Sequence, residues 1–280
     1  MLNIRLLITP MFLVTVSLNG IGQNNDFIKS NIPFHDDCIT IYRLNTDSTA
    51  QIKQNIIVAE YKKEAPCKHK ISIAYSDSIL RKTSSFAVDS KALVALNGGF
   101  FDVEKGGSVA FLEVGGKVIS QTRKSKGKWA KTDSLLNGAV IIDTTGDLKI
   151  ERAKPVKFYA HSSQEEAVMI AGPTLLADGK IIELESSDFV KRRHPRSCLC
   201  KTADQRILFI AIDGRSIDAN GMNLKELQHF LIKLNCKDAI NLDGGGSTTL
   251  WMNDGIEKAI LNHPSDKTGE RSVSNIIYIK

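Results

Sequence analysis

The chain has 280 residues, with 37 lysines and arginines against 31 aspartates and glutamates, and 42% of its residues are hydrophobic. This composition is typical of a globular protein with enough apolar material for one large core, and the length allows one domain or two. It excludes a collagen, a coiled coil and an extensively disordered chain, and no repeat or low-complexity tract marks a linker.

The first 22 residues have the pattern of a secretory signal peptide. Arg5 provides the positive charge, residues 6–16 are nearly all apolar, and Gly20 and Gly22 are the small residues that a signal peptidase recognises. A buried helix is the weaker reading, because it would place Pro10 in its interior. We therefore expect cleavage between Gly22 and Gln23, and an exported protein, periplasmic or extracellular, without stable membrane insertion.

The remaining residues, 23–280, are predicted to form a single domain. The densest basic cluster, at residues 123–131, is spaced by serine and glycine and is typical of a solvated loop. Such a loop could attract anionic substrates. A nucleic-acid partner is not expected, because the chain has no recognisable binding motif for one.

The chain has five cysteines, an odd number for an oxidising compartment. We expect most of them to be small buried hydrophobic residues, and Cys38–Cys67 is the one disulfide that we consider. Cys198 and Cys200 lie two residues apart and would point to the same face of a strand, which is poor geometry for a bond between them. Their spacing alone is a weak zinc signal.

The middle of the chain is predicted to be antiparallel sheet. Residues 112–119 and 175–182 each have the pattern of a hairpin, closed by Gly115-Gly116 and by Asp178-Gly179. Residues 139–143 and 148–150 form a third pair of strands, joined by a short turn.

The last third of the chain is predicted to contain a βαβ unit. Residues 206–212 are a continuous apolar run, typical of a strand buried on both faces. A helix follows from Asn223, where Glu226 completes a capping box, and a second apolar strand covers residues 239–242. The expected fold class is therefore mixed α/β, a large mixed sheet with flanking helices and a C-terminal βαβ unit.

Two aspartates follow the two strands of this unit. Asp213 and Asp243 each precede a glycine, and the carboxyl ends of parallel strands meet at the ligand-binding edge of a sheet. Gly244, Gly245 and Gly246 could also present backbone N–H groups to an anion. Both aspartates could instead cap turns, but two matched strand ends favour a site. Asn97, which also ends an apolar strand, could bind sugar hydroxyls.

Six segments, taken in order, resemble the phosphodiester glycosidase family. They are ALNGGFFD (95–102), AGPTLLADGK (171–180), HPRS (194–197), FIAIDGR (209–215), NLKELQHFLIKLNCKDAINLDGGGSTTL (223–250) and ERSVSN (270–275). The resemblance covers residues 90–280 and is strongest from residue 194. One departure is that the family usually has Arg-Thr-Ala-Ile-Gly where this chain has residues 196–200, so the glycine is replaced by Cys200.

The resemblance implies an enzyme that hydrolyses sugar-1-phosphodiesters at the anomeric carbon. Arginines would bind the phosphate bidentately, and a carboxylate would stabilise the oxocarbenium-like transition state. The candidate catalytic residues are Asp243 and Asp213. The candidate substrate- and phosphate-binding residues are Arg196, Arg215, Arg271, Asn97, Gly98, Gly99, Asn241, Gly244, Gly245, Gly246, Ser247 and Asn275. His161, His194 and His263 are interpreted as structural or solvated.

Two other functions fit the same residues. A catalytically inactive domain could bind phosphorylated glycans or cell-wall polymers with the same arginines. A metal-dependent phosphodiesterase could cleave the P–O bond, with Asp213, Asp243 and Asn241 as oxygen ligands for calcium or magnesium. No cofactor is expected for the glycosidase, apart from a structural calcium or magnesium as an alternative, and the expected partner is a phosphorylated carbohydrate substrate.

Overall fold

The structure is a computed structural model, which describes residues 14–16, 27–46, 49–64, 66–122, 135–160, 162 and 164–280. The predicted signal-peptide cleavage, the basic cluster at 123–131 and His161 lie outside these residues. Of the predicted signal peptide only Val14–Val16 (β1) is described, as a short edge strand paired with β2. None of the described helices has the length and apolar composition that crossing a bilayer requires.

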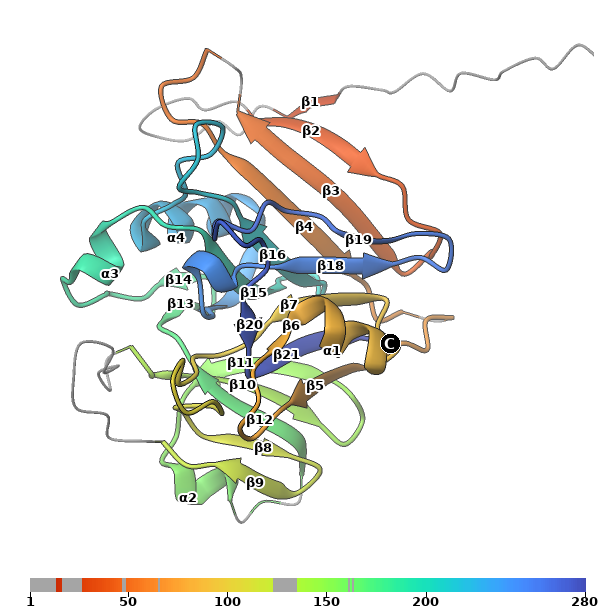
Figure 1. Ribbon diagram of the computed structural model, residues 1–280, viewed down its shortest axis with the longest axis vertical. Helices are drawn as coiled ribbons and strands as arrows, with labels where there is room; N and C mark the ends of the chain where they lie inside the picture. The colour runs from red at the N-terminus through yellow and green to blue at the C-terminus, as the bar shows by residue number, and fades with distance from the viewer. Residues whose placement is uncertain are drawn as a thin grey trace, which may run out of the picture.

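The largest element is a nine-stranded sheet. In spatial order its strands are β1, β2 (Phe27–Ile32), β3 (Ile39–Thr46), β4 (Asn55–Tyr61), β16 (Ile207–Ile212), β15 (Arg196–Thr202), β17 (Cys236–Asn241), β13 (Thr174–Ala177) and β14 (Lys180–Ile181). In Figure 1, β2, β3 and β4 form the orange end of the molecule, opposite β8 and β9.

Two five-stranded sheets and one two-stranded sheet complete the described strands. The first five-stranded sheet contains β11 (Leu148–Arg152), β10 (Gly138–Asp143), β12 (Glu165–Ala171), β8 (Leu112–Val114) and β9 (Lys117–Ser120). The second contains β19 (Lys258–Ile260), β18 (Leu250–Asn253), β7 (Val94–Asn97), β21 (Asn275–Ile279) and β5 (Ile71–Tyr75), and β20 (Ser272–Val273) pairs with β6 (Arg81–Lys82).

The described helices are short. They are α1 (Thr83–Asp89), α2 (Val156–Tyr159), α3 (Asp188–Lys191), α4 (Leu224–Lys233) and the 3₁₀ turn η1 (Gly245–Ser247). The capping box predicted for α4 is present: Asn223 accepts from the backbone of Glu226, whose side chain accepts from the backbone of Asn223. The fold is therefore mixed α+β, as expected, but it contains far more sheet than helix.

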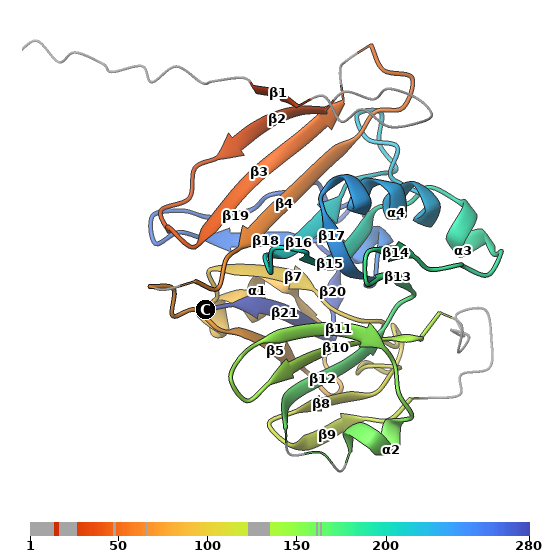
Figure 2. The ribbon, with the colours of Figure 1, turned by 180° about the vertical axis from the view of Figure 1, so that it is seen from behind.

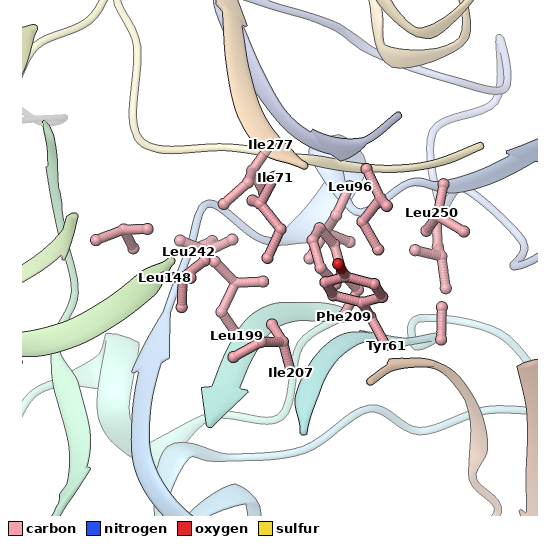
Figure 3. Packing of buried hydrophobic residues seen from close by; sticks show 14 of the residues in the cluster. Tyr61, Ile71, Leu96, Leu148, Leu199, Ile207, Phe209, Leu242, Leu250 and Ile277 are labelled. Carbon is pink, nitrogen blue, oxygen red and sulfur yellow. The ribbon is translucent and has the colours of Figure 1, made fainter. Parts of the chain in front are cut away.

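The central strands are buried on both faces because two layers cover the nine-stranded sheet. Val58, Leu208 and Ile210 pack against the apolar stripe of α4, which Figure 2 shows lying along β15, β16 and β17. Alternate residues, among them Phe209, pack on the opposite face in the main core, which also takes in residues of the two five-stranded sheets. Figure 3 shows Phe209 in this core beside Tyr61. Residues 207–212 form a continuous apolar run because both faces of β16 are covered.

The three hairpins predicted from the sequence are confirmed. Strands β8 and β9 are joined by Gly115 and Gly116, and β13 and β14 by Asp178 and Gly179, all four with positive φ. This is the conformation of the two-residue turn that suits the twist of antiparallel strands. Strands β10 and β11 form the third pair.

The predicted βαβ unit needs correction. The strands before and after α4 are not hydrogen-bonded to each other, because β15 lies between β16 and β17 and pairs antiparallel with both. All pairings among the described strands are antiparallel. Two strands that are each antiparallel to β15 run in the same direction, so β16 and β17 still end at one edge of the sheet.

Two disulfides form, one expected and one not. Cys38 and Cys67 are bonded, with Cα atoms 5.8 Å apart, as considered from the sequence. Cys200 and Cys236 form a second disulfide across neighbouring strands β15 and β17, also with a Cα separation of 5.8 Å. Cys198 is buried and reduced. The expectation that most cysteines are unpaired was therefore wrong, because Cys200 pairs across the sheet and not along its own strand.

Candidate active site

The candidate site forms where three strands end. Asp213 directly follows β16, and its backbone N–H donates to the carbonyl of Asn55 at 2.9 Å. Asp243 lies two residues after β17, and its N–H donates to the carbonyl of Gly98, which follows β7, at 3.1 Å. These bonds tie the ends of β16 and β17 to neighbouring strands. The proximity of the two carboxylates to a common ligand stays a prediction.

The glycine loop at 244–246 is covered by two arginines. Gly245 has a φ of +64°, and a Cβ on it would lie 3.0 Å from Nη2 of Arg215. A Cβ on Gly246 would overlap Asp266 and Arg271. Residues 215 and 271 are far apart in the chain, yet their guanidinium groups lie against consecutive glycines. The structure therefore brings Arg215, Arg271 and the glycine loop together.

Arg215 is exposed and adopts a φ of +63° immediately after the Asp213-Gly214 turn. Its Nη2 lies 3.3 Å from Nδ1 of His194. Burial, and then the charges of Arg196, Arg215 and Arg192, lower the pKa of His194 to about 4. His194 is therefore neutral near pH 7, so its Nδ1 can accept a hydrogen bond from Arg215 and orient the guanidinium.

Arg271 is held by Asp266 through two parallel hydrogen bonds, from Nε at 2.7 Å and from Nη2 at 2.9 Å. This is the bidentate geometry that the planar guanidinium favours. The side chains of Arg271 and Asp266 remain 37% and 29% exposed. Arg271 is therefore fixed in direction but still accessible to a ligand above Gly246.

Arg196 has a different position from the one expected. It is 1% exposed, and it donates from Nε to the carbonyl of Met222 at 3.0 Å and from Nη2 to the carbonyls of Phe189 and Arg192 at 2.7 and 3.0 Å. Burial, and then the charge of Arg215, lower its pKa to about 9. These bonds anchor the segment around α3 to β15 and give Arg196 a structural role, while its predicted phosphate contact stays a prediction.

The two aspartates also differ in their surroundings. Asp213 is 2% exposed, and its oxygens accept from Asn262 Nδ2 at 3.0 Å and from the backbone N–H of His263 at 2.9 and 3.0 Å. Asn55 Nδ2 donates to its Oδ2 at 2.5 Å, and Nδ1 of His263 lies 3.1 Å from the same oxygen. Asp243 is only partly buried and begins the glycine loop. Asp213 thus orders the surrounding loops, and the catalytic role of Asp243 stays a prediction.

Asn97 and Asn275 form part of the framework beneath the loop. Asn97 is fully buried, donates from Nδ2 to the carbonyl of Asp243 at 2.7 Å and accepts from Ser197 Oγ at 2.6 Å. Asn275 accepts from the N–H of Gly99 at 2.8 Å. The amide of Asn97 therefore holds the backbone of Asp243, and its predicted contact with sugar hydroxyls stays a prediction.

The other predicted positions are close-packed. A Cβ on Gly98 would overlap Asn275, and one on Gly244 would lie 2.6 Å from the carbonyl of Pro195, so both positions require glycine. Asn241 is fully buried and donates from Nδ2 to the carbonyl of Gly172 at 2.9 Å. Within the described residues, Asn241 Oδ1 and Ser247 Oγ are buried without a hydrogen-bond partner.

The metal alternative stays a prediction. Asp213 accepts N–H hydrogen bonds on both oxygens, which leaves fewer lone pairs for a metal ion. Elsewhere in the described ranges, Asp36, Cys38 and His69 bring three potential ligand atoms together. Cys38 is bonded to Cys67, however, so its sulfur is not a thiolate donor.

Comparison with known proteins decides the family. The phosphodiester glycosidase family matches residues 90–280, which include the glycine loop and both of its arginines. The chain belongs to this family. The N-acetylglucosamine-1-phosphodiester alpha-N-acetylglucosaminidase of Bos taurus is 26% identical over 201 residues, which are 68% of this chain and 37% of that protein. The Bacillus subtilis prophage-derived protein YomE is 29% identical over 92 residues, 28% of this chain and 14% of YomE.

Solved structures show the same fold. The catalytic domain of the zebrafish N-acetylglucosamine-1-phosphodiester alpha-N-acetylglucosaminidase, auto-inhibited by its pro-peptide, superimposes with a TM-score of 0.68 at 22% identity, over 90% of this chain and 87% of that domain. A hypothetical protein from Synechocystis has a TM-score of 0.62 at 16% identity, over 87% of this chain and 62% of that protein. The chain spans little more than a third of the bovine enzyme, 37% of its length.

The departure from the family pattern now has a structural counterpart. Cys200 occupies the position at which the family usually has glycine, and its disulfide to Cys236 links β15 to β17. β15 begins at Arg196, and β17 ends two residues before Asp243. The substitution therefore adds a covalent tie within the sheet without placing a new group at the glycine loop.

Sequence reasoning missed several residues around the site. Asp266, Asn55 and Asn262 were not considered, and His194 and His263 were interpreted as structural or solvated. The HPRS segment was a usable signal for His194, because it places the histidine two residues before Arg196. No local pattern marks Asn55, which reaches Asp213 only because β4 pairs with β16.

Proposed function

We propose that this member of the family hydrolyses a sugar-1-phosphodiester at the anomeric C–O bond. The observation that carries the proposal is the placement of Arg215 and Arg271 on Gly245 and Gly246, next to Asp243. Two guanidinium groups and a glycine turn suit a phosphodiester anion, since arginine binds phosphate through parallel N–H donors and glycine allows a close approach. The curated relatives with an assigned name act on N-acetylglucosamine-1-phosphodiesters, which agrees with this substrate class.

The phosphate is also the leaving group of the proposed reaction. A phosphomonoester is far less basic than a sugar alkoxide, so neutralisation of its charge by Arg215 and Arg271 can replace a strong general acid. Bidentate pairing with Asp266 keeps Arg271 in one orientation, and neutral His194 does the same for Arg215. Little reorganisation is then needed as negative charge develops on the leaving oxygen.

Asp243 is the proposed carboxylate for the anomeric carbon. It would act as the nucleophile or as the base for water, the two roles that carboxylates play in glycoside hydrolysis. Its backbone is held on both sides, by the N–H bond to Gly98 and by the amide of Asn97. We propose that Asp213 is a positioning residue instead, because it accepts hydrogen bonds from Asn262 and His263 and so holds them beside the loop.

We also propose that the protein is exported. Support comes from the leader-like segment at 1–22 and from the two disulfides, which form and persist in oxidising compartments.

Hydrolysis in oxygen-18 water, with a glucose-1-phosphodiester and an N-acetylglucosamine-1-phosphodiester as substrates, tests the reaction. We expect the label in the sugar product. Asp243→Asn keeps the size of the side chain and removes its charge, so kcat should fall on the order of a thousandfold or more while phosphodiester binding persists. The matched control is Asp77→Asn, at an exposed aspartate outside the site, which should turn over normally.

Other outcomes would redirect the assignment. Label in the phosphate product means P–O cleavage and contradicts the glycosidase mechanism. Binding of the diesters without turnover by the intact protein supports a binding domain instead. A near wild-type rate for Asp243→Asn removes Asp243 from the chemistry and makes Asp213 the leading candidate.

A further inference from the structure

A cluster of metal-ligating side chains lies outside the candidate active site, beside the disulfide between Cys38 and Cys67. Asp36, Cys38 and His69 each offer one ligand atom, and these three atoms lie within 4.8 Å of one another. The bond to Cys38 places a fourth potential donor, Sγ of Cys67, next to them. A carboxylate, an imidazole and two sulfurs thus meet in one place. Among the described residues, no other group of three such donors forms.

The oxidation state of the two sulfurs decides whether they can bind a metal. In the disulfide, neither sulfur is a thiolate. A dithiol reductant would give two electrons and two protons to the disulfide, which releases Cys38 and Cys67 as thiols while the reductant becomes a disulfide itself. Each thiol then loses its proton to solvent as it binds a metal ion. The reduced chain therefore offers two thiolates, one imidazole and one carboxylate.

This donor set suits zinc. Zinc takes thiolate, imidazole and carboxylate ligands in tetrahedral sites of four protein ligands. Calcium and magnesium prefer oxygen ligands throughout, so two thiolates disfavour them. The cluster provides the four ligands of such a tetrahedral site without any residue from elsewhere in the chain.

The distances in the cluster are close to those of a zinc site. In a tetrahedral site, two N or O ligand atoms lie about 3.3 Å apart and two sulfurs about 3.8 Å apart. Nε2 of His69 lies 2.7 Å from Oδ2 of Asp36, and it donates this bond because a carboxylate only accepts. Zinc would replace that proton, and the two atoms would part by less than about 1 Å. The Cα atoms of the two cysteines, 5.8 Å apart, keep both sulfurs within reach of one ion.

Both segments that carry the ligands are held by bonds other than the disulfide. Cys38 directly precedes β3, and its carbonyl accepts from the N–H of Lys62 at 2.9 Å. Oδ1 of Asp36 accepts from the N–H of Cys38 at 2.8 Å, which leaves Oδ2 for an ion. Tyr61 donates from its hydroxyl to the carbonyl of His69 at 2.7 Å. The ligands should therefore stay near one another after the disulfide is reduced.

The cluster is also accessible. The side chains of His69 and Asp36 are 23% and 20% exposed, and Cys67 is half-buried. The second disulfide differs, because Cys200 and Cys236 are 0% and 4% exposed within the nine-stranded sheet. The disulfide beside His69 is therefore the more accessible of the two to a reductant and to an ion.

We propose that the reduced form of this chain binds one zinc ion through the four side chains of the cluster, Asp36, Cys38, Cys67 and His69. The ion and the disulfide are alternatives, and either closes the same segment of the chain, which contains β3 and β4. This hairpin supplies Asn55 to Asp213. Zinc would thus hold the hairpin in a chain whose first disulfide is open. The inference is independent of the proposed reaction.

Zinc binding by the intact protein, before and after reduction, tests the proposal. The protein is reduced with a dithiol, which is then removed without air, and a competing chromophoric chelator measures the affinity. We expect one zinc per reduced chain with a Kd on the order of nanomolar, and binding by the disulfide form at least about a thousandfold weaker. His69→Ala should weaken binding by the reduced chain about a hundredfold or more. Asp36→Asn, which keeps an acceptor for Cys38 but loses the charge, should weaken it about tenfold or more.

Two controls match these variants. His35 neighbours Asp36 but pairs with Asp254 at 2.8 Å, so His35→Ala should change the zinc affinity less than about twofold. The double variant Cys200→Ser/Cys236→Ser removes the other pair of thiols and should still bind one zinc ion after reduction.

A folding measurement keeps the test decisive. His69→Ala and Asp36→Asn retain both disulfides, so thermal unfolding before reduction shows whether each variant is folded. Zinc should raise the melting temperature of the reduced wild-type protein relative to a sample with EDTA, or restore its circular dichroism if reduction unfolds it. Failure of zinc to do either would overturn the site. Equally tight binding by the disulfide form, by reduced His69→Ala or by a Cys38→Ser/Cys67→Ser chain would overturn it as well.

Discussion

At the scale of single residues, neighbouring groups determine what each charged side chain of the site can do. Arg196 and Arg271 are both arginines of the family-like motifs. Arg196 is 1% exposed and bound to backbone carbonyls, whereas Arg271 is 37% exposed and held in the plane of Asp266. Arg271 is the more accessible of the two. We therefore propose Arg271 as the residue whose geometry, beyond its charge, matters for phosphate binding.

Arg271→Lys tests this geometry. Lysine keeps the charge but cannot form two parallel bonds, either to Asp266 or to a phosphate. We expect kcat/KM to fall by a factor of about thirty to a thousand, which corresponds to about 2–4 kcal/mol of transition-state stabilisation. Steady-state kinetics measures the change.

Arg206→Lys is the control for this prediction. Arg206 is also ion-paired, with Glu60 and Asp204, but it precedes β16 at the opposite end from Asp213. Its substitution should change kcat/KM less than about twofold, the small effect typical of surface ion pairs. A wild-type rate for Arg271→Lys, or an equal loss for both variants, would contradict the assignment.

At the scale of elements, strand β8 contains a buried carboxyl group, that of Glu113, outside the glycine loop. Glu113 is 2% exposed, and its Oε2 has no hydrogen-bond partner among the described residues. Burial, and then the nearby charge of Glu165, raise its pKa above the ordinary value. When the pKa of a carboxyl is higher in the folded state than in the unfolded state, the free energy of unfolding decreases as pH rises from the unfolded pKa to the folded pKa. At neutral pH the buried carboxyl of Glu113 therefore destabilises the fold.

Glu113→Gln should stabilise the protein at neutral pH. Glutamine fills the same space without a charge, so the melting temperature at pH 7 should rise by about 2–4 °C, the change that roughly 1 kcal/mol causes in a domain of this size. At about pH 3, well below the ordinary glutamate pKa, the wild-type carboxyl is protonated in both states, and the gain should vanish. Thermal unfolding at about pH 3 and at pH 7 measures the difference. The exposed Glu185→Gln serves as control, and a gain of equal size at both pH values would disprove the cause.

At the scale of the whole molecule, the N-terminal strands complete both the sheet and the site. β2, β3 and β4 precede the segment that matches the family, yet β4 pairs along the full length of β16 and provides Asn55 to Asp213. The disulfide between Cys38 and Cys67 closes this region, and the disulfide between Cys200 and Cys236 ties two central strands. The folded state of the exported chain should therefore contain a single thiol.

Intact-mass spectrometry of the exported protein tests this whole-chain expectation. We expect a chain that begins at Gln23 and carries two disulfides, so alkylation after denaturation without a reductant should label Cys198 alone. Reduction should raise the mass by about 4 Da and destabilise the fold by about 2–4 kcal/mol for each disulfide. A protein made without residues 1–22 in a reducing cytoplasm is the control. An intact Met1 terminus, or five labelled cysteines, would contradict the prediction.

The sequence by itself determined the local features of this protein. Positive φ at Gly115, Gly116 and Gly179, and the capping box of Asn223 and Glu226, depend on neighbours within a few residues, so their signals are present in the chain. The apolar run at 207–212 likewise indicated a strand covered on both faces. The motifs of residues 194–275 identified the family, which the comparison confirmed.

Only the tertiary structure decided the arrangement of the sheet and the division of roles in the site. β15 lies between β16 and β17, and β4 lies beside β16, because these pairings are fixed by the packing of distant strands and not by local propensity. The same packing joins Cys200 to Cys236, buries Arg196, saturates Asp213 with N–H donors and leaves Asp243 beside the glycine loop. Burial and hydrogen-bond partners come from residues far away in the chain, so identical residue types acquired different roles.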